Sequence, residues 1–141
     1  MSAKIIDGRK IAGTLRHELK DKIARHLKSG IARPPCLAVL LIGHDPASEI
    51  YVSHKEKNCA LVGIQSITVR RPSSITQKEV IELIKQFNND PTVDGILLQL
   101  PLPAHIDKIY TIGAIDPQKD VDGITPVNEG KLVWHYPGIY P

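Results

Sequence analysis

Leu37-Ala38-Val39-Leu40-Leu41-Ile42 is an unbroken apolar run, and the turn Gly43-His44-Asp45-Pro46 follows it at once. A continuous apolar run bounded by turn residues is typical of a strand that is buried on both faces of a parallel sheet. Asp45 is a favoured N-cap residue, and Pro46 suits the first position of a helix. The stretch therefore predicts a central strand over residues 37–42 and a helix that begins at residue 46.

This predicted helix places three polar side chains on one face. Tyr51 and Lys55 are four residues apart, and Ser48 lies one turn before Tyr51. Ligands of open α/β sheets bind outside the carboxyl ends of the strands, which is where this helix begins. Tyr51 and Lys55 are therefore candidate site residues. The other interpretation is a half-buried ring beside a solvated charge.

The alternation of strand and helix continues along the chain. Residues 64–69 predict an edge strand, because polar residues interrupt the apolar ones, and Gly95-Ile96-Leu97-Leu98-Gln99-Leu100-Pro101 predicts a second buried strand. Between them, Thr76-Gln77-Lys78-Glu79 has the pattern of a capping box that opens a helix. Strands that alternate with helices form right-handed βαβ units. We therefore expect an α/β fold, a three-layer sandwich with a mostly parallel sheet flanked by helices.

The two ends of the chain are less regular. Asp7 can cap a long helix that covers the core, and Gly30 is its expected end. Residues 106–115 predict a short helix, and no closing element is predicted for the tail. The apolar stripe of the first helix recurs every four residues, at Ile11, Leu15, Leu19, Ile23 and Leu27.

Gln99 is the polar exception in the second buried strand. Pro101 ends the pairing of that strand, so Gln99 lies near its carboxyl end, on the same edge of the sheet as the Tyr51 helix. A buried amide costs roughly 1–3 kcal/mol unless its donor and acceptor groups are both paired. Gln99 is therefore a further candidate site residue, although the local backbone could also satisfy it.

An acidic loop, Asp116-Pro117-Gln118-Lys119-Asp120-Val121-Asp122-Gly123, follows. Closely spaced acids before a glycine suggest a cation site, but only Asp120 and Asp122 obey the alternate spacing of a calcium loop. A turn built from Asp, Pro and Gly is the simpler interpretation. A metal-dependent enzyme built on Asp116, Asp120 and Asp122 is an alternative, while our prediction includes no metal.

Composition and charge exclude several kinds of partner. The chain of 141 residues has 18 Lys and Arg against 15 Asp and Glu, and the basic residues are scattered, so we expect no nucleic-acid partner. No apolar run approaches the roughly 20 residues that cross a membrane, so we expect no membrane partner. Met1 is present without a signal peptide, which favours one cytoplasmic domain in which Cys36 and Cys59 are reduced.

Four motifs, taken in order, resemble one protein family. They are Ala3-Lys4-Ile5-Ile6-Asp7-Gly8, then Pro46-Ala47-Ser48 with Tyr51-Val52 and Lys55, then Asp94-Gly95-Ile96-Leu97-Leu98-Gln99-Leu100-Pro101-Leu102-Pro103, and last Lys119-Asp120-Val121-Asp122-Gly123. The family is that of the bifunctional methylenetetrahydrofolate dehydrogenase/methenyltetrahydrofolate cyclohydrolases. The resemblance runs from near residue 3 to about residue 132. It implies one-carbon interconversion of tetrahydrofolate substrates, a place in purine biosynthesis, NADP as cofactor, and a homodimeric full-length enzyme.

The resemblance also implies roles for particular residues. The residue that matches Lys55 is the catalytic amine in this family, and the one that matches Gln99 hydrogen-bonds and orients it. The residue that matches Tyr51 stacks on the folate rings, and the one that matches Asp122 recognises the pterin edge. Substrate contacts are further predicted at four positions around these, Ser48, Leu98, Leu100 and Pro101.

The chain departs from this family in its length and its glycines. Family members are roughly twice as long, and their second half is a nucleotide-binding domain with a Gly-rich turn, whereas this sequence contains no G-x-G. We therefore expect residues 1–125 to form the folate-binding catalytic domain, and residues 126–141 to begin the linker to an absent C-terminal domain that binds NADP. The chain would then be a catalytic domain alone or a truncated gene product.

Activity depends on that absent half. We expect the chain alone to be inactive as a dehydrogenase, since it has no evident place for NADP. Its cyclohydrolase activity is left open, because the absent half would also leave the folate cleft partly uncovered. The alternative function is a non-catalytic folate-binding or interaction module.

Overall fold

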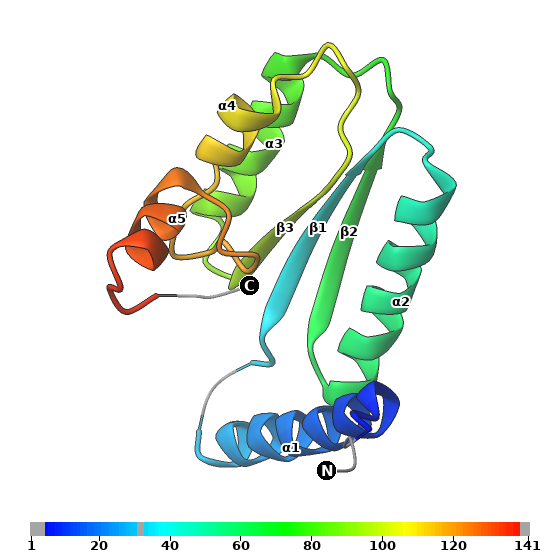
Figure 1. Ribbon diagram of the computed structural model, residues 1–141, viewed down its shortest axis with the longest axis vertical. Helices are drawn as coiled ribbons and strands as arrows, with labels where there is room; N and C mark the ends of the chain where they lie inside the picture. The colour runs from blue at the N-terminus through cyan, green and yellow to red at the C-terminus, as the bar shows by residue number, and fades with distance from the viewer. Residues whose placement is uncertain (1–4, 31–32, 139–141) are drawn as a thin grey trace.

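The computed structural model describes residues 5–30 and 33–138, and Figure 1 shows how their helices and strands are arranged. Ala3 and Lys4 of the first motif, and residues 139–141 of the predicted linker, lie outside the described residues. The elements in chain order are α1 (Gly8–Lys28), β1 (Cys36–Ile42), α2 (Pro46–Val62), β2 (Gln65–Arg71), α3 (Gln77–Asn89), β3 (Gly95–Gln99), α4 (Lys108–Gly113) and α5 (Pro126–Val133).

β1 lies at the centre of a parallel sheet whose strand order is β2-β1-β3. Val39 of β1 aligns with Thr68 of β2 and with Leu97 of β3. The predicted burial of this strand is confirmed, since every residue of β1 except Leu37 is buried. β2 is an edge strand, as predicted, because its outer side pairs with no described strand. Since the strands are parallel, their carboxyl ends meet at one edge of the sheet.

Helices cover both faces of the sheet. Alternate residues of a strand point to opposite faces, so Val39 packs with Val52 of α2, whereas Leu40 packs with residues of α3 and β3. Figure 1 shows α2 on one side of the sheet and α3 with α4 on the other. The predicted three-layer α/β sandwich is therefore confirmed. The buried residues that α3 contributes to the larger cluster are Val80, Ile84 and Phe87.

The main helices begin and end at the capping residues that the sequence offers. Asp45 accepts a hydrogen bond from the Ser48 backbone N–H at 2.8 Å, so α2 begins where predicted. It ends at Gly63, whose φ of 88° lies in the left-handed region that glycine adopts without strain. Thr76 and Glu79 form the predicted capping box of α3.

α1 has its predicted start but covers little of the core. Asp7 is its N-cap and Ser29 its C-cap, one residue before the expected end. Ile23 is the one buried residue within this helix, whereas Leu15 is 58% exposed. α1 packs mainly against α2, near the amino ends of the strands (Figure 1). The prediction of a covering helix is wrong for most of its length, because periodicity identifies an apolar face but not what covers it.

α5 lies in the stretch for which no closing element is predicted. Thr125 is its N-cap, Pro126 is its first residue and Glu129 lies in its first turn, all of which are ordinary start signals. Asn128 is the one buried residue within its eight. The helix therefore buries no apolar stripe, and it is too short for hydrophobic periodicity to identify it. It occupies part of the predicted linker, and the domain boundary at residue 125 stays a prediction.

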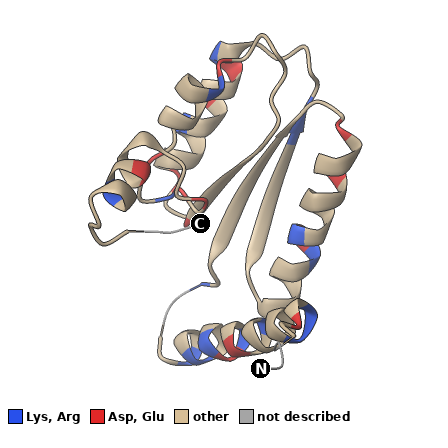
Figure 2. Cartoon of the chain, in the orientation of Figure 1, with Lys and Arg blue, Asp and Glu red and all other residues tan. Residues whose placement is uncertain are grey.

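Charged residues of both signs occur on several helices. Figure 2 shows lysines, arginines and acidic residues on α1, α2 and α3 alike. Cys36 and Cys59 are free and buried, and burial raises the pKa of both thiols. In residues 5–30 and 33–138, no helix has the length and apolar character needed to span a membrane.

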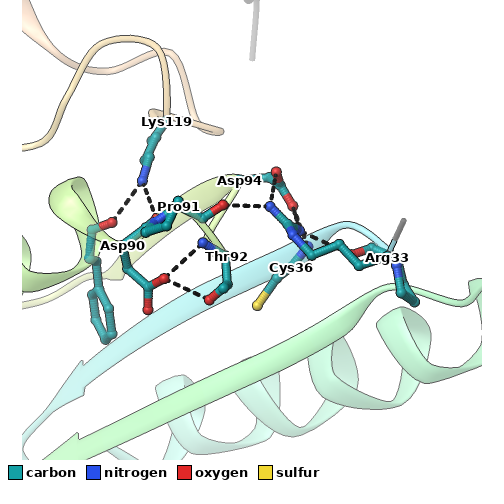
Figure 3. A network of polar contacts seen from close by, with 9 residues as sticks. Arg33, Cys36, Asp90, Pro91, Thr92, Asp94 and Lys119 are labelled. Carbon is teal, nitrogen blue, oxygen red and sulfur yellow. Dashed lines mark hydrogen bonds and ion pairs between the residues drawn. The ribbon is translucent and has the colours of Figure 1, made fainter. Parts of the chain in front are cut away.

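An ion pair joins the segment before β1 to the segment before β3 (Figure 3). Arg33 donates from Nη1 to Asp94 Oδ2 at 2.6 Å and from Nη2 to Asp94 Oδ1 at 2.9 Å. The same carboxylate accepts the backbone N–H of Cys36 at 2.8 Å. Asp94 therefore holds the first residue of β1 beside the start of β3. Nearby, Lys119 donates to two backbone carbonyls at the end of α3.

The segment after α4 lies along the outer edge of β3. Ile96 donates its backbone N–H to the Lys119 carbonyl at 2.7 Å and forms a parallel bridge with Asp120. A Cβ built on Gly95 would overlap Cγ1 of Val121. A side chain at residue 95 would therefore force the Val121 side chain out of its position against β3.

Asp94→Asn should weaken the dependence of stability on acid pH. The hydrogen bond from Arg33 lowers the pKa of Asp94, and burial opposes it only in part. Such a carboxylate stabilises the fold above its unfolded pKa of about 3.9, and the contribution is lost as the pH falls through the lower folded-state pKa. Urea midpoints at about pH 7 and about pH 3 should therefore differ less for the variant than for the unmodified chain. An equal pH dependence in both would contradict the prediction.

Gly95→Ala should lower the free energy of unfolding by about 1–3 kcal/mol, the usual cost of forcing extra atoms into a packed position. Gly113→Ala is the matched control, because a Cβ there meets no atom within 4 Å. The control should leave stability unchanged or raise it by about 0.5–1 kcal/mol, since alanine is the better helix former. Urea unfolding of both variants is the measurement, and equal losses would contradict the packing argument.

Candidate active site

The first turns of α2 face the carboxyl end of β3. Ser48 Oγ lies 3.2 Å from the Leu100 carbonyl oxygen, and Lys55 Nζ lies 3.2 Å from Gln99 Oε1. Tyr51 lies between Ser48 and Lys55 on the same helix face. The structure therefore brings together the polar residues that the sequence placed on one helix face and at one edge of the sheet.

Gln99 has both ends of its side-chain amide engaged. Oε1 accepts from Lys55 Nζ, and Nε2 donates to the Leu100 carbonyl at 2.7 Å. The second bond sets which way the amide points, because a reversed amide would bring its oxygen against the carbonyl oxygen. The local backbone thus satisfies the amide donor, while the role of Gln99 as a site residue stays a prediction. The result is an uncharged acceptor presented to the lysine.

The Leu100 carbonyl oxygen links α2 to the end of β3. It accepts Gln99 Nε2, and it lies close to the hydroxyl of Ser48, which is only 2% exposed. Ser48 Oγ also lies 2.7 Å from Asp45 Oδ2. Hydrogen bonds from the Ser48 side chain and backbone lower the pKa of Asp45. The start of α2 is therefore fixed against the strand that presents Gln99.

The larger side chains around the Lys55–Gln99 pair differ in their exposure to solvent. The Tyr51 ring is 61% exposed, so a flat ligand can reach its face. Leu100 is half-buried and Pro101 is exposed, and the peptide bond between them is cis. Leu98, in contrast, is 2% exposed and belongs to the core cluster that includes α3. Its predicted substrate contact gains no support from this position.

Asp120 and Asp122 have different surroundings. Asp120 is 1% exposed and accepts from the Thr125 backbone N–H at 2.8 Å and from Asn128 Nδ2 at 2.9 Å. Asp122 is half-buried, and its carboxylate has no hydrogen-bond or ion-pair partner among the residues that the structure describes. It follows the bridge between Ile96 and Asp120 by two residues, toward the carboxyl edge of the sheet. Among the described residues, no hydrogen bond or ion pair joins Asp122 to Lys55 or Gln99, so a shared ligand would span between them.

The described residues do not fit NADP. Pyrophosphate groups bind at helix N-termini that offer free backbone N–H groups beside a Gly-rich turn. An acidic side chain stands at the N-terminus of each of the five helices that the structure describes, namely Asp7, Asp45, Glu79, Asp107 and Glu129. Each carboxylate would repel a phosphate.

The metal alternative gains no support from the structure. In the described ranges 5–30 and 33–138, no group of three His, Cys, Asp or Glu side chains is placed to hold a metal ion. Asp120, which the alternative requires as a ligand, is already engaged by Thr125 and Asn128. Within the acidic loop, Asp120 is therefore satisfied by protein donors, whereas Asp122 is not.

Thr125 and Asn128 bind the Asp120 carboxylate, and the sequence patterns did not identify either residue. The available signal is the pair Thr125-Pro126, which predicts a helix start and places Asn128 in the first turn. Nothing in the sequence indicates that the Asn128 side chain turns back to Asp120. That contact depends on how α5 packs.

Comparison with known proteins identifies relatives over the whole chain. A family model described as tetrahydrofolate dehydrogenase/cyclohydrolase, catalytic domain, matches residues 6–122. The bifunctional protein FolD of Maricaulis maris (strain MCS10) is 46% identical over 141 residues, which is 100% of this chain and 47% of that protein. The chain thus spans about half the length of the curated relative it matches.

Solved structures of the same kind of enzyme share the fold. The bifunctional FolD methylenetetrahydrofolate dehydrogenase/cyclohydrolase from Campylobacter jejuni has a TM-score of 0.91 at 43% identity, over 96% of this chain and 48% of that chain. The N5,N10-methylenetetrahydrofolate dehydrogenase-cyclohydrolase from Trypanosoma brucei, solved with NADP cofactor and inhibitor, has a TM-score of 0.93 at 33% identity, over 100% of this chain and 48% of that chain.

Ser48→Ala should lower the free energy of unfolding by about 1–2 kcal/mol, because it removes a buried hydroxyl that links Asp45 to the Leu100 carbonyl. Ser53→Ala on the same helix is the matched control, since the half-buried Ser53 side chain makes no hydrogen bond within the described part of the chain. Urea unfolding measures both. A loss as large for Ser53→Ala as for Ser48→Ala would contradict the linking role.

Proposed function

The chain belongs to the tetrahydrofolate dehydrogenase/cyclohydrolase family, and we propose that it forms the folate-binding, catalytic part of a bifunctional one-carbon enzyme. The observation that carries the proposal is the contact of Lys55 with Gln99 at the carboxyl edge of the sheet, beside the exposed ring of Tyr51. Because the chain spans about half the length of its relatives, the activity of the whole protein is part of the proposal. Residues 1–125 form the folate-binding domain in this proposal.

The proposed whole protein performs two consecutive reactions. The first oxidises 5,10-methylenetetrahydrofolate to the 5,10-methenyl cation, with NADP as the hydride acceptor. The second adds water to the cation and opens the ring, which gives 10-formyltetrahydrofolate and releases one proton. The described residues do not fit NADP, so no residue of this chain is assigned to the oxidation. The hydrolysis is the step that we assign to this chain.

Tyr51 and Asp122 are the proposed contacts of the pterin ring. A pterin is flat, and the exposed ring of Tyr51 offers an aromatic face on which it can stack. The exocyclic amine and the neighbouring ring N–H of a pterin are adjacent donors, and the unpartnered carboxylate of Asp122 can accept from both. Leu100 and Pro101 are the proposed apolar neighbours of the substrate, since both are accessible.

Lys55 is the proposed catalytic residue of the hydrolysis. In its uncharged form its amine can take a proton from the water that attacks the methenyl carbon, or from the hydroxylated intermediate before the ring opens. Gln99 supports this role because its oxygen is an uncharged acceptor that holds Nζ in place. The chemistry depends on positioning and needs no covalent intermediate with the protein.

A homodimer and a cytoplasmic location complete the proposal for the whole protein. The family resemblance supports the homodimer. The free thiols of Cys36 and Cys59 support a reducing compartment.

Lys55→Gln should slow the hydrolysis of 5,10-methenyltetrahydrofolate by about a hundredfold or more, the usual contribution of a positioned acid or base. Glutamine can still hydrogen-bond to Gln99 but has no basic amine. Lys57→Gln is the matched control, because Lys57 lies exposed on the same helix and should keep the unmodified rate. The measurement is the loss of methenyltetrahydrofolate absorbance against a blank without protein.

Unchanged hydrolysis by Lys55→Gln would contradict the catalytic role. If the unmodified chain does not exceed the blank, these residues alone are not a cyclohydrolase. Binding of 5-formyltetrahydrofolate would then identify a non-catalytic folate-binding module, and its absence would contradict the folate assignment itself.

A further inference from the structure

Asp120 is a buried carboxylate that the proposed hydrolysis does not use. Its Oδ2 accepts both the Thr125 backbone N–H at 2.8 Å and Asn128 Nδ2 at 2.9 Å. Burial acts to raise the pKa of Asp120, but the hydrogen bonds from Thr125 and Asn128 outweigh burial and lower the pKa. The charged form is therefore stabilised by Thr125, within residues 120–125, which we call the Asp120 loop, and by Asn128 of α5.

Asn128 joins that loop to α5 through a single amide group. Its Nδ2 donates to Asp120 Oδ2 and to the Pro117 carbonyl, each at 2.9 Å. The side chain of Asn128 is 3% exposed. An amide nitrogen has two protons, and here each of them engages a different point of the segment before Asp122. An aspartate at this position would have the same shape but no proton to donate.

The Asp120 loop is thus held at both ends. At its start, the bridge of Asp120 with Ile96 fixes it to the edge of β3. At its end, the Thr125 N–H is bound to the Asp120 carboxylate. Gly123, with a φ of 67°, allows the tight return of the chain between these points. Asp122 lies between the fixed ends, and its own carboxylate makes no polar contact with any described residue.

We propose that Asp120 and Asn128 are positioning residues for pterin recognition, which hold the Asp120 loop so that the free carboxylate of Asp122 faces the ligand. This inference rests on the proposed function, because it assumes that Asp122 binds the pterin. It adds that the position of Asp122 depends on the docking of α5, since Asn128 is a residue of that helix.

A positioning role makes a specific prediction about coupling between residues. Residues that act through one another have non-additive effects, whereas independent residues have additive effects. If Asn128 acts only by placing Asp122, its substitution should cost no further affinity once Asp122 has already lost its carboxylate. Its cost should be unchanged in a variant that lacks the Tyr51 ring.

The experiment is a set of calorimetric titrations of the full chain with 5-formyltetrahydrofolate, a stable compound that carries the pterin ring. Asn128→Asp and Asp122→Asn should each raise Kd by roughly tenfold to a hundredfold, as expected for loss of hydrogen bonds to a charged group. The double variant of these two should bind no more weakly than Asp122→Asn alone. Asn128→Asp combined with Tyr51→Ala should show the product of the two single effects.

Asn88→Asp is the matched control for Asn128→Asp. Asn88 also has an engaged amide, which donates to the Ala114 carbonyl at 2.8 Å and accepts the Asp116 N–H at 2.9 Å, but it belongs to α3 and contacts only the start of the acidic loop. The same substitution there should lower stability and leave Kd unchanged. If circular dichroism shows Asn128→Asp to be unfolded, Asn128→Ser takes its place, because it removes the amide without adding a charge.

The outcomes separate this inference from the proposed function. No binding by the unmodified chain, or unchanged binding by Asp122→Asn, would overturn the folate assignment or the pterin role of Asp122, and the inference with it. Weaker binding by Asp122→Asn with unchanged binding by Asn128→Asp would overturn the inference alone. So would an Asn128→Asp effect that stays equally large in the Asp122→Asn background.

Discussion

The burial of β1 on both faces and along both edges is the constraint on which the rest of the structure depends. Such a strand needs a neighbouring strand at each edge and a helix on each face, and β2, β3, α2 and α3 supply them. Connections between parallel strands must cross over, so α2 begins at the edge of the sheet where β1 and β3 both end. Lys55 and Gln99, 44 residues apart in the sequence, meet there as a consequence of topology.

At that edge, the backbone carbonyl of Leu100 determines the arrangement of the side chains. Gln99 and Ser48 reach it from two different elements. A backbone acceptor in a defined chain segment has no rotamers of its own, so fixing side chains against it costs less conformational entropy than pairing two flexible side chains. It also decides the direction of the Gln99 amide. Reversing that amide would present a donor to Lys55, and two donors repel each other.

Features of the fold and the site that depend on residues close together in the sequence could be predicted from it, whereas side-chain contacts between residues far apart could not. Asp45 and Pro46 specify the start of α2 because a cap acts within three or four residues. The shared edge of Lys55 and Gln99 follows from the alternation of strands and helices, but the hydrogen bond between them does not. The apolar stripe of α1 is a further example, because its sequence pattern does not indicate which element, if any, packs against it. Contacts that depend on packing alone have no local signature, and here they include Arg33–Asp94 and Asp120–Asn128.

A carboxylate that recognises a ligand has to be held in place and also left unpaired, and one side chain cannot easily meet both demands. Hydrogen bonds that fixed Asp122 directly would occupy the lone pairs that a pterin needs. In our proposal the chain divides the task, because Asp120 takes the donors of Thr125 and Asn128, and Asp122 is held only through the backbone between fixed ends. Gln99 has the same relation to Lys55, since its donor is used on Leu100 and its acceptor holds the amine. In both parts of the proposed site, a satisfied neighbour would position the group that we assign to the substrate. The free-energy cost of an unpaired polar group is then confined to Asp122, where hydrogen bonds to the proposed ligand would offset it.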